Sequence, residues 1–179
     1  QVNRYITKPM EVQNDRFSLI DILNENHDKN KVAFYYENSR GDKEVYTYGK
    51  LNQLSKKFAR VLKNAGVGKG TKVAVLLPKG VETFVSALAI WRLGAVYLPL
   101  FTAFEHQAIQ FRIQHSKASV IITDRWNRSK ISDALANLDR PLKLQVITVD
   151  CRENIDIDLD FWKSLKEAEA YEEKALVKK

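Results

Sequence analysis

Cysteine and histidine are scarce in this sequence, which holds one Cys and three His among its 179 residues. A lone cysteine, Cys151, cannot form an internal disulfide, and the cytoplasm is therefore the expected compartment. His27, His106 and His115 are not spaced as ligands of one metal ion, so we expect no bound metal. His106 and His115 are interpreted as surface or half-buried side chains.

Long apolar stretches are also missing from the chain. The longest apolar run is short and is broken by Arg92 and Gly94, so no membrane-spanning helix is predicted. The first ten residues, QVNRYITKPM, lack the apolar core of a signal peptide. Because the chain starts with Gln1 and not with Met, we expect it to be a piece of a longer or processed protein.

Acidic residues are outnumbered by basic ones, 22 to 29, which leaves a net charge of +7. Residues 1–151 carry 23 Lys or Arg against 14 Asp or Glu, whereas residues 152–179 carry 6 against 8. A basic body suits an anionic ligand such as a nucleotide or a coenzyme, but scattered surface lysines explain the charge without any partner, and we favour that interpretation. Nucleic-acid binding is not expected, since it needs clustered cations with exposed aromatics and the charge here is dispersed.

Hydrophobic periodicity predicts an alternation of strands and helices. Turn residues around Gly41 join two β-rich runs, 32–38 and 43–48, into a hairpin. The pattern then predicts strands over 71–78, 95–100, 119–124 and 144–150 and helices over 17–26, 48–65, 80–93, 104–116, 128–138 and 158–179. This order predicts an α/β fold, a parallel sheet with helices on both faces plus an N-terminal β-hairpin. We expect residues 1–16 to form a lead-in arm and residues 17–179 a single α/β domain.

The segment GVGKG, residues 66–70, is a candidate phosphate-binding loop that fails on two counts. A P-loop would need Gly in place of Lys63 and Ser or Thr in place of Gly70. The segment also runs from a helix into a strand, so its amides lie at the wrong end of the helix to meet a phosphate. We interpret it as a helix C-cap and turn, with Thr47 capping the other end of the same helix.

Charged residues follow two of the predicted strands, at the edge where open parallel sheets bind ligands. Asp124 and Asp150 end these strands, and without a glycine fingerprint a capping role is favoured over a hold on a ribose. Arg125, Arg128 and Lys130 follow on what we expect to be one loop, where phosphate binding and plain solvation are equally consistent with the sequence. The three tryptophans are interpreted as core or rim packing, and no pair of carboxylates marks an acid–base dyad.

Residues 45–124 contain, in order, VYTYGKL, GVGKGTKVAV, an apolar helix ending in GAVYLPL, the run RIQHSKAS and a strand ending in IITD. This set resembles the opening of the adenylate-forming superfamily, the acyl- and acetyl-CoA synthetases, with a looser likeness over 17–38 and 125–179. The segment PLFTAF, residues 99–104, is most similar to the short- and medium-chain acid–CoA ligases. Lys50 and Thr71 depart from the Glu and Asp usual in the family, and each change costs about 0.5–1 kcal/mol of local stability at most.

Members of that superfamily use ATP, Mg²⁺ and CoA to convert a carboxylic acid into an acyl-adenylate and then a thioester, so the resemblance implies a ligase. Their Ser/Thr/Gly-rich phosphate loop, adenine and ribose motifs, hinge and catalytic Lys have no counterpart in this sequence. The resemblance therefore implies an N-terminal subdomain that has no catalytic residues, binds no cofactor by itself and is inactive alone. Its expected partners are the rest of its own chain, a small carboxylic acid and CoA, and the face left bare could support a homodimer.

By the same resemblance, two segments lie near the nucleotide end of CoA, one after the strand over 95–100 and one after the strand over 119–124. The candidate residues are Phe101, Thr102, Ala103, Phe104, Arg125, Arg128 and Lys130. Thr102 and Ala103 stand where acetyl-CoA synthetase-like members have two glycines. Arg128 is the best candidate for a phosphate contact, with a solvated arginine as the alternative. A free-standing α/β module that binds an anionic ligand or a partner protein is the other hypothesis for the whole chain.

Overall fold

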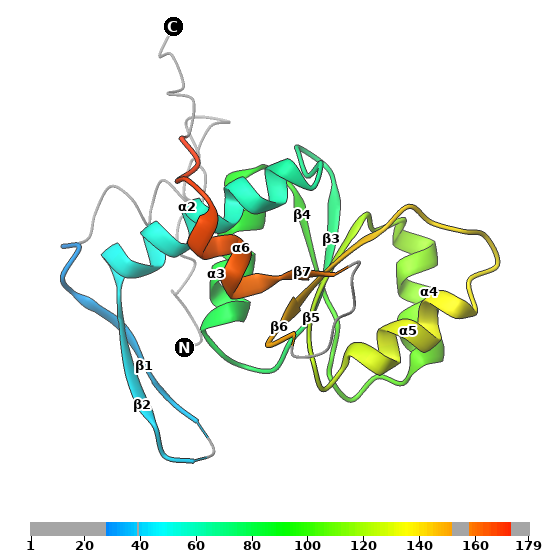
Figure 1. Ribbon diagram of the computed structural model, residues 1–179, viewed down its shortest axis with the longest axis horizontal. Helices are drawn as coiled ribbons and strands as arrows, with labels where there is room; N and C mark the ends of the chain where they lie inside the picture. Colours follow the sequence, from blue (N-terminus) through cyan, green and yellow to red (C-terminus); the bar gives the residue numbers. More distant parts are fainter. Residues whose placement is uncertain (1–27, 39, 152–157, 173–179) are drawn as a thin grey trace, which may run out of the picture.

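The computed structural model describes residues 28–38, 40–151 and 158–172 (Figure 1). The predicted arm over 1–16 and the predicted helix over 17–26 lie outside the described residues. The described elements, in chain order, are β1 (Val32–Glu37), β2 (Lys43–Thr47), α2 (Tyr48–Asn64), β3 (Lys72–Leu76), α3 (Val81–Arg92), β4 (Val96–Pro99), α4 (His106–Ser116), β5 (Val120–Asp124), α5 (Arg128–Ala136), β6 (Gln145–Val149), β7 (Leu159–Asp160) and α6 (Phe161–Glu167).

Five strands form a parallel sheet in the order β4-β3-β5-β6-β7, and β1 and β2 form a separate antiparallel hairpin. Helices α2, α3 and α6 cover one face of the sheet, and α4 and α5 cover the other (Figure 1). The strands serve both layers because successive side chains point to opposite faces. Val73 and Val75 pack with the first group of helices, Ala74 and Leu76 with the second. The predicted α/β fold, with helices on both faces and a hairpin, is confirmed.

Helix α2 begins and ends where its sequence predicts. The Thr47 hydroxyl accepts a hydrogen bond from the Lys50 amide (3.1 Å), and Gly66 follows the helix with a left-handed φ of 86°. The Gly68 amide then donates to the Thr71 hydroxyl (3.0 Å), so the Thr71 side chain holds the turn that leads into β3. These contacts confirm that GVGKG is a helix end and a turn.

The hairpin packs on α3 through aromatic rings. Phe34 stacks on Tyr46 with ring centroids 5.1 Å apart and contacts Phe84 of α3 at 4.8 Å. Burial, together with a hydrogen bond donated by its hydroxyl to Glu44, raises the pKa of Tyr46 above its usual range. The outer side chains of the hairpin stay open to solvent, with Tyr35 77% and its cross-strand neighbour Val45 53% exposed. The hairpin therefore leaves an apolar outer surface on the face that points away from α3.

The C-terminal part of the chain differs from the predicted single helix over 158–179. Leu159–Asp160 instead form β7, which pairs in parallel with β6, and the helix α6 is confined to Phe161–Glu167. One cause of the late helix start is the cap at Asp160. The Asp160 carboxylate accepts a hydrogen bond from the Lys163 amide (2.7 Å) and so begins the helix at Phe161. The prediction of one long helix is therefore wrong over 158–160 and 168–172, and its last part, 173–179, lies outside the described residues.

After α6 the chain runs as an extended segment beside α2. The Tyr171 amide donates to the Lys56 carbonyl of α2 (3.1 Å), and the Arg60 guanidinium lies 5.6 Å from the centre of the Tyr171 ring. Phe161 and Leu165 of α6 are buried in the core on the same face of the sheet as α2. Among the described helices, none is long and apolar enough to cross a bilayer.

Candidate functional site

The connections of β3 and β5 define a switch point at the carboxyl edge of the sheet. The chain leaves β3 through α3 on one face toward β4, and leaves β5 through α5 on the opposite face toward β6. β3 and β5 are neighbours, joined at this edge by a hydrogen bond from the buried Thr123 hydroxyl to the Leu76 carbonyl (3.2 Å). Ligands of open α/β sheets bind in the crevice where neighbouring connections diverge in this way. The candidate site is therefore built from the loops that follow β3, β4 and β5.

The loop after β4 holds the first predicted segment, 101–104. Leu100 anchors it to the core, because its amide donates to the Val75 carbonyl of β3 (2.9 Å). Phe101 and Phe104 meet edge to face with centroids 5.3 Å apart, and the Arg112 guanidinium covers the Phe104 ring at 4.1 Å. Phe101 remains 69% exposed. The loop therefore offers one aromatic ring to solvent and keeps the other as its support.

The loop after β5 begins at Asp124, which is 8% exposed. Its carboxylate accepts from the Asn127 amide (2.8 Å) and from the Asn127 side-chain amide (2.9 Å), so the predicted capping role of Asp124 is confirmed. The Arg125 amide donates to the Val149 carbonyl of β6 (3.2 Å). The Arg125 guanidinium lies over the Trp126 ring at 3.9 Å, and Trp126 is 73% exposed. Both ends of this short loop are thus fixed, and the Arg125 guanidinium and the Trp126 indole lie at the carboxyl edge of the sheet.

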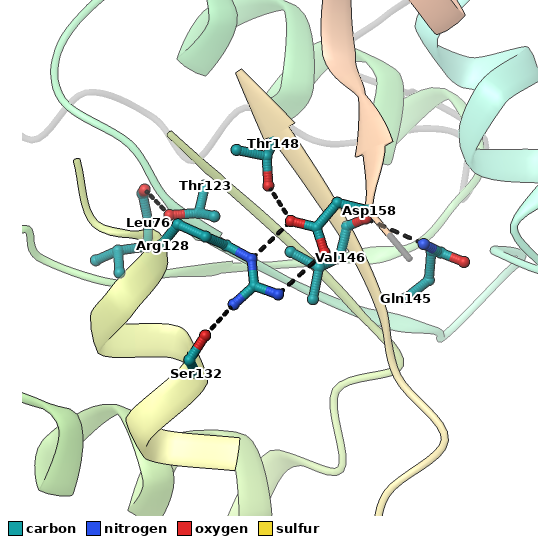
Figure 2. Close-up of polar contacts among 8 residues, drawn as sticks. All are labelled: Leu76, Thr123, Arg128, Ser132, Gln145, Val146, Thr148 and Asp158. Atoms are coloured by element: carbon teal, nitrogen blue, oxygen red, sulfur yellow. Dashed lines mark hydrogen bonds and ion pairs between the residues drawn. The ribbon is translucent and has the colours of Figure 1, made fainter. Parts of the chain in front are cut away.

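Arg128 lies in the first turn of α5, as the predicted helix over 128–138 requires, and not on the loop where Arg125 lies. Its Nε and Nη2 donate to the two carboxylate oxygens of Asp158 at 2.6 and 3.0 Å, and its Nη1 donates to the Ser132 hydroxyl at 2.6 Å (Figure 2). The Thr148 hydroxyl of β6 donates to the same carboxylate at 2.7 Å. The side chains of Arg128 and Asp158 are only 12% and 2% exposed. This ion pair ties α5 to the segment that carries β7 and α6.

Sequence reasoning missed Asp158 as the partner of Arg128. The two residues are 30 positions apart, and Asp158 was expected inside a helix. A buried carboxylate just after the fourth strand gives no local signal, since only the pairing of β7 with β6 brings it under α5. The role of Arg128 as a phosphate ligand stays a prediction, and in this structure its guanidinium is paired with the Asp158 carboxylate.

Lys130 also lies in the first turn of α5, and it joins the two predicted segments. Its ammonium donates to the Thr102 carbonyl (2.9 Å) and lies 3.7 Å from the Glu105 carboxylate. Thr102 is half-buried and Ala103 is exposed, so the loop accommodates both side chains where the resemblance suggested glycines. The structure therefore brings 101–104 and 125–130 together at one edge through a direct contact between α5 and the loop after β4.

Two further acidic residues near this edge are Glu82 and Asp150. Burial raises the pKa of Glu82, in the first turn of α3, although the Trp162 indole donates a hydrogen bond to its carboxylate (3.1 Å) and opposes that rise. Asp150, at the end of β6, is exposed and adopts a left-handed φ of 55°. Within 28–38, 40–151 and 158–172, no three His, Cys, Asp or Glu side chains are grouped as metal ligands. At this edge the Arg125 guanidinium and the exposed rings of Phe101 and Trp126 are the groups open to a ligand.

Both predicted histidine positions match their interpretation. His106, the first residue of α4, is half-buried. His115 is exposed and stacks on the Phe111 ring with centroids 5.7 Å apart. Neither lies in the loops that follow β3, β4 and β5.

Comparisons with known proteins extend this description. A family model described as AMP-binding enzyme matches residues 23–177. The chain is 32% identical over 133 residues to a 3-hydroxypropionyl-coenzyme A synthetase of Sulfurisphaera tokodaii, covering 73% of this chain and 20% of that protein. It is 36% identical over 109 residues to an acetyl-coenzyme A synthetase of Chlorobaculum tepidum, covering 61% of this chain and 16% of that protein.

A solved structure shares the fold. The crystal structure of a Brucella canis acyl-CoA synthetase superposes with a TM-score of 0.70 at 31% identity, covering 79% of this chain and 26% of that one. The chain thus spans about a fifth of the length of the two curated relatives described above.

Proposed function

The chain belongs to the family of AMP-binding enzymes, and from that premise we propose that it is part of an ATP-dependent acid–CoA ligase. In the proposed reaction a short- or medium-chain carboxylic acid and ATP form an acyl-adenylate and pyrophosphate, and CoA then takes the acyl group and releases AMP. The observation that carries the proposal is the match over 23–177 together with relatives that are named CoA synthetases. ATP and Mg²⁺ are assigned to parts of the enzyme outside this chain, and the cytoplasm is the proposed compartment.

Within that enzyme we assign to this chain the nucleotide end of CoA. Support comes from the switch point between β3 and β5 and from the contact of Lys130 with Thr102, which joins the two candidate segments. Arg125 is the cation left open to a phosphate, because in the described part of the chain its guanidinium contacts only an aromatic ring. Arg128 and Lys130 are engaged in ion pairs with Asp158 and Glu105, and these pairs fix α5 against the neighbouring segments.

Activity of the isolated chain tests whether catalysis lies elsewhere. The 179-residue chain is incubated with ATP, Mg²⁺ and a series of short and medium-chain carboxylic acids, and released pyrophosphate is measured. We expect no acid-dependent release above a boiled control. Acid-dependent release would overturn the assignment of the chemistry to another part of the enzyme.

Calorimetric titration of the complete ligase with CoA tests the assigned rim, since the 179-residue chain by itself is expected to bind no cofactor. The variant Arg125→Ala is expected to weaken CoA binding by about tenfold or more, since it removes a charged contact to phosphate. Lys63→Ala is the matched control, because Lys63 is an exposed cation at the far end of α2 and its loss also removes one charge. Equal affinities of the two variants would reject Arg125 as the phosphate contact.

The exposed side chains of the hairpin favour a second candidate, a free-standing module with a protein partner. Tyr35 and Val45 lie opposite each other on the outer face of the hairpin and are each more than half exposed, and exposed apolar groups that lie together mark an interface. We assign this surface to the rest of the enzyme. A native reading frame that continues past Lys179 into a Ser/Thr/Gly-rich loop supports the ligase, and a stop codon there supports the free-standing module. Concentration-dependent dimerisation of the isolated chain in analytical ultracentrifugation would show that it self-associates, as expected of an exposed apolar surface.

A further inference from the structure

Helix α3 reverses the polarity expected of a helix on the surface of a domain. Its only charged residues, Glu82 and Arg92, are half-buried, whereas its two aromatic residues, Phe84 and Trp91, are 53% and 38% exposed. A surface helix normally turns its charged side chains to water and its apolar side chains to the core, and a helix that is apolar on all sides is typical of the interior of a larger protein. The reversal therefore indicates that the outer side of α3 is covered in the intact protein.

Both charged side chains of α3 are bonded to neighbouring helices. The Glu82 carboxylate accepts a hydrogen bond from the Trp162 indole of α6 (3.1 Å). The Arg92 guanidinium donates from Nε to the Ser55 hydroxyl of α2 (3.0 Å) and from Nη2 to the Asn52 side chain of the same helix. Because these contacts lie within the layer formed by α2, α3 and α6, the outer side of α3 carries no charge of its own.

The apolar residues on the outer side of α3 form one stripe. Phe84, Leu88 and Trp91 are spaced by four and three residues, so they lie on one side of the helix. Trp91 meets Tyr97 of the edge strand β4 with ring centroids 6.1 Å apart, and Phe84 contacts Phe34 of the hairpin at 4.8 Å. We call Phe84, Leu88, Trp91 and Tyr97 the α3 stripe, which runs from the hairpin to the edge of the sheet.

The edge of the sheet beside the α3 stripe does not suit the addition of another strand. The Val96 and Leu100 amides donate toward the β3 side at 2.8 and 2.9 Å, so the alternate residues Tyr97 and Pro99 turn their backbone groups outward. Pro99 has no N–H to donate, and proline is typical of a strand that stays at the edge of its sheet. An occupant of the stripe is therefore held by its side chains and not by backbone pairing.

We propose that the α3 stripe is the surface on which an apolar helix from the remaining part of the same ligase packs. Residues spaced by four and three form the ridges that interdigitate when two helices pack together. This inference rests on the proposed function, because it takes the chain as part of a longer enzyme. The chain covers 20% of the Sulfurisphaera tokodaii relative and 26% of the Brucella canis structure, so most of such an enzyme lies outside it.

The path of the described chain favours an occupant from the same polypeptide. The Tyr171 amide donates to the Lys56 carbonyl of α2 (3.1 Å), so the last described residues reach the layer of helices that contains α3. Helices α2 and α3 lie on the same face of the sheet (Figure 1) and are joined by the contacts of Arg92 with Ser55 and Asn52. The described chain thus ends on the face that carries the α3 stripe.

Hydroxyl-radical footprinting of the complete ligase and of the 179-residue chain tests this packing without any substitution. Oxidation of the stripe residues is measured by mass spectrometry in both proteins, and Phe111 is the reference because it is 66% exposed on α4, on the opposite face of the sheet. We expect oxidation of Phe84 and Trp91, relative to Phe111, to fall by about fivefold or more in the complete ligase, since a packed interface is as dense as a protein interior. Equal relative oxidation in the two proteins would overturn the inference.

Phe84→Glu and Phe111→Glu are a matched pair of variants for a second measurement. Each places a carboxylate at an exposed position of a helix and removes one ring contact, with Phe34 or with His115. In the 179-residue chain the two variants should lower the urea midpoint by similar amounts. In the complete ligase Phe84→Glu should lower it by about 1 M more than Phe111→Glu, because only that variant buries an unpaired charge. Equal midpoints of the two variants in the ligase would contradict the packing.

The outcomes separate this inference from the proposed function. If analytical ultracentrifugation shows that the stripe is protected only at concentrations where the ligase dimerises, the occupant is a second copy and the assignment to the same chain is refuted. If a monomeric ligase forms CoA thioesters but leaves the stripe as reactive as in the 179-residue chain, the packing is refuted and the proposed function stands. If the longer protein protects the stripe but forms no thioester, the packing stands and the proposed function fails.

Discussion

The ion pair between Arg128 and Asp158 yields the sharpest stability prediction. The variant Asp158→Ala removes the acceptor of two guanidinium hydrogen bonds and of the Thr148 hydroxyl, at a site where the carboxylate is 2% exposed. Loss of one partner of a buried pair costs about 3–5 kcal/mol, because the other charge is left without compensation. Arg128 keeps 12% of its side chain exposed and can recover some hydration, so we expect the lower end, about 3 kcal/mol.

Urea unfolding followed by tryptophan fluorescence measures this change. With a slope of about 2 kcal/mol per M, a loss of 3 kcal/mol lowers the unfolding midpoint by about 1.5 M. The double variant with Arg128→Met should recover much of the loss, since replacing both charges by apolar groups is often neutral, and a coupling energy of about 2–3 kcal/mol is expected.

An exposed pair in the same chain serves as the control. Lys43 and Glu37 lie 3.5 Å apart on the hairpin with side chains 74% and 58% exposed, so Lys43→Ala should cost less than about 1 kcal/mol. If Asp158→Ala is no more costly than Lys43→Ala, or if the double variant is additive, the structural role of the pair is refuted. In that case Arg128 would be free to serve as the phosphate ligand that its sequence position suggested.

Three further predictions follow from single contacts. Lys130→Met removes the hydrogen bond to the Thr102 carbonyl, so hydrogen exchange of the amides over 101–104 should become faster while stability falls by only about 0.5–1.5 kcal/mol; unchanged exchange would show that the loop is held otherwise. Burial raises the pKa of Glu82 in the folded state, so the contribution of Glu82 to the unfolding free energy should be fully present below the ordinary Glu pKa and be lost as pH rises through the raised pKa. Urea unfolding at several pH values measures this pH dependence of stability. The variant Glu82→Gln should reduce the dependence, and an unchanged dependence would reject the assignment to Glu82. Phe161→Ala empties a fully buried site against Phe58, whose ring centroid lies 4.3 Å away, and should cost about 3–5 kcal/mol in urea unfolding; a loss under about 1 kcal/mol would mean that α6 is not docked on the core.

Much of the fold could be predicted from the sequence because the deciding signals are local. Helix α2 is defined by its apolar stripe, by the Thr47 cap and by Gly66, all within one segment. The central strands read as short apolar runs because a parallel sheet buries them on both faces, and alternation with helices then requires a parallel sheet with right-handed crossovers. The capping role of Asp124 was also predictable, since its partner Asn127 lies three residues away.

The sequence pattern failed where a structure depends on a distant partner. β7 has only two residues, and two residues carry no periodicity; backbone pairing with β6 creates this strand. The predicted helix over 158–179 failed for the related reason that the Asp160 cap and the pairing of β7 outweigh a helical apolar stripe.

The sequence by itself determined the order of the elements from β1 to β6, the faces they bury and the family resemblance, because these depend on residues within a turn or two of each other. The tertiary structure alone decided what the candidate cations do. Arg128 meets Asp158 across 30 residues, and Lys130 meets Thr102 across 28, because the crossovers bring the loops of separate strands to one edge. The same packing leaves Arg125 and Trp126 open, and neither their burial nor their partners can be read from neighbouring residues, since both depend on how the whole sheet is assembled.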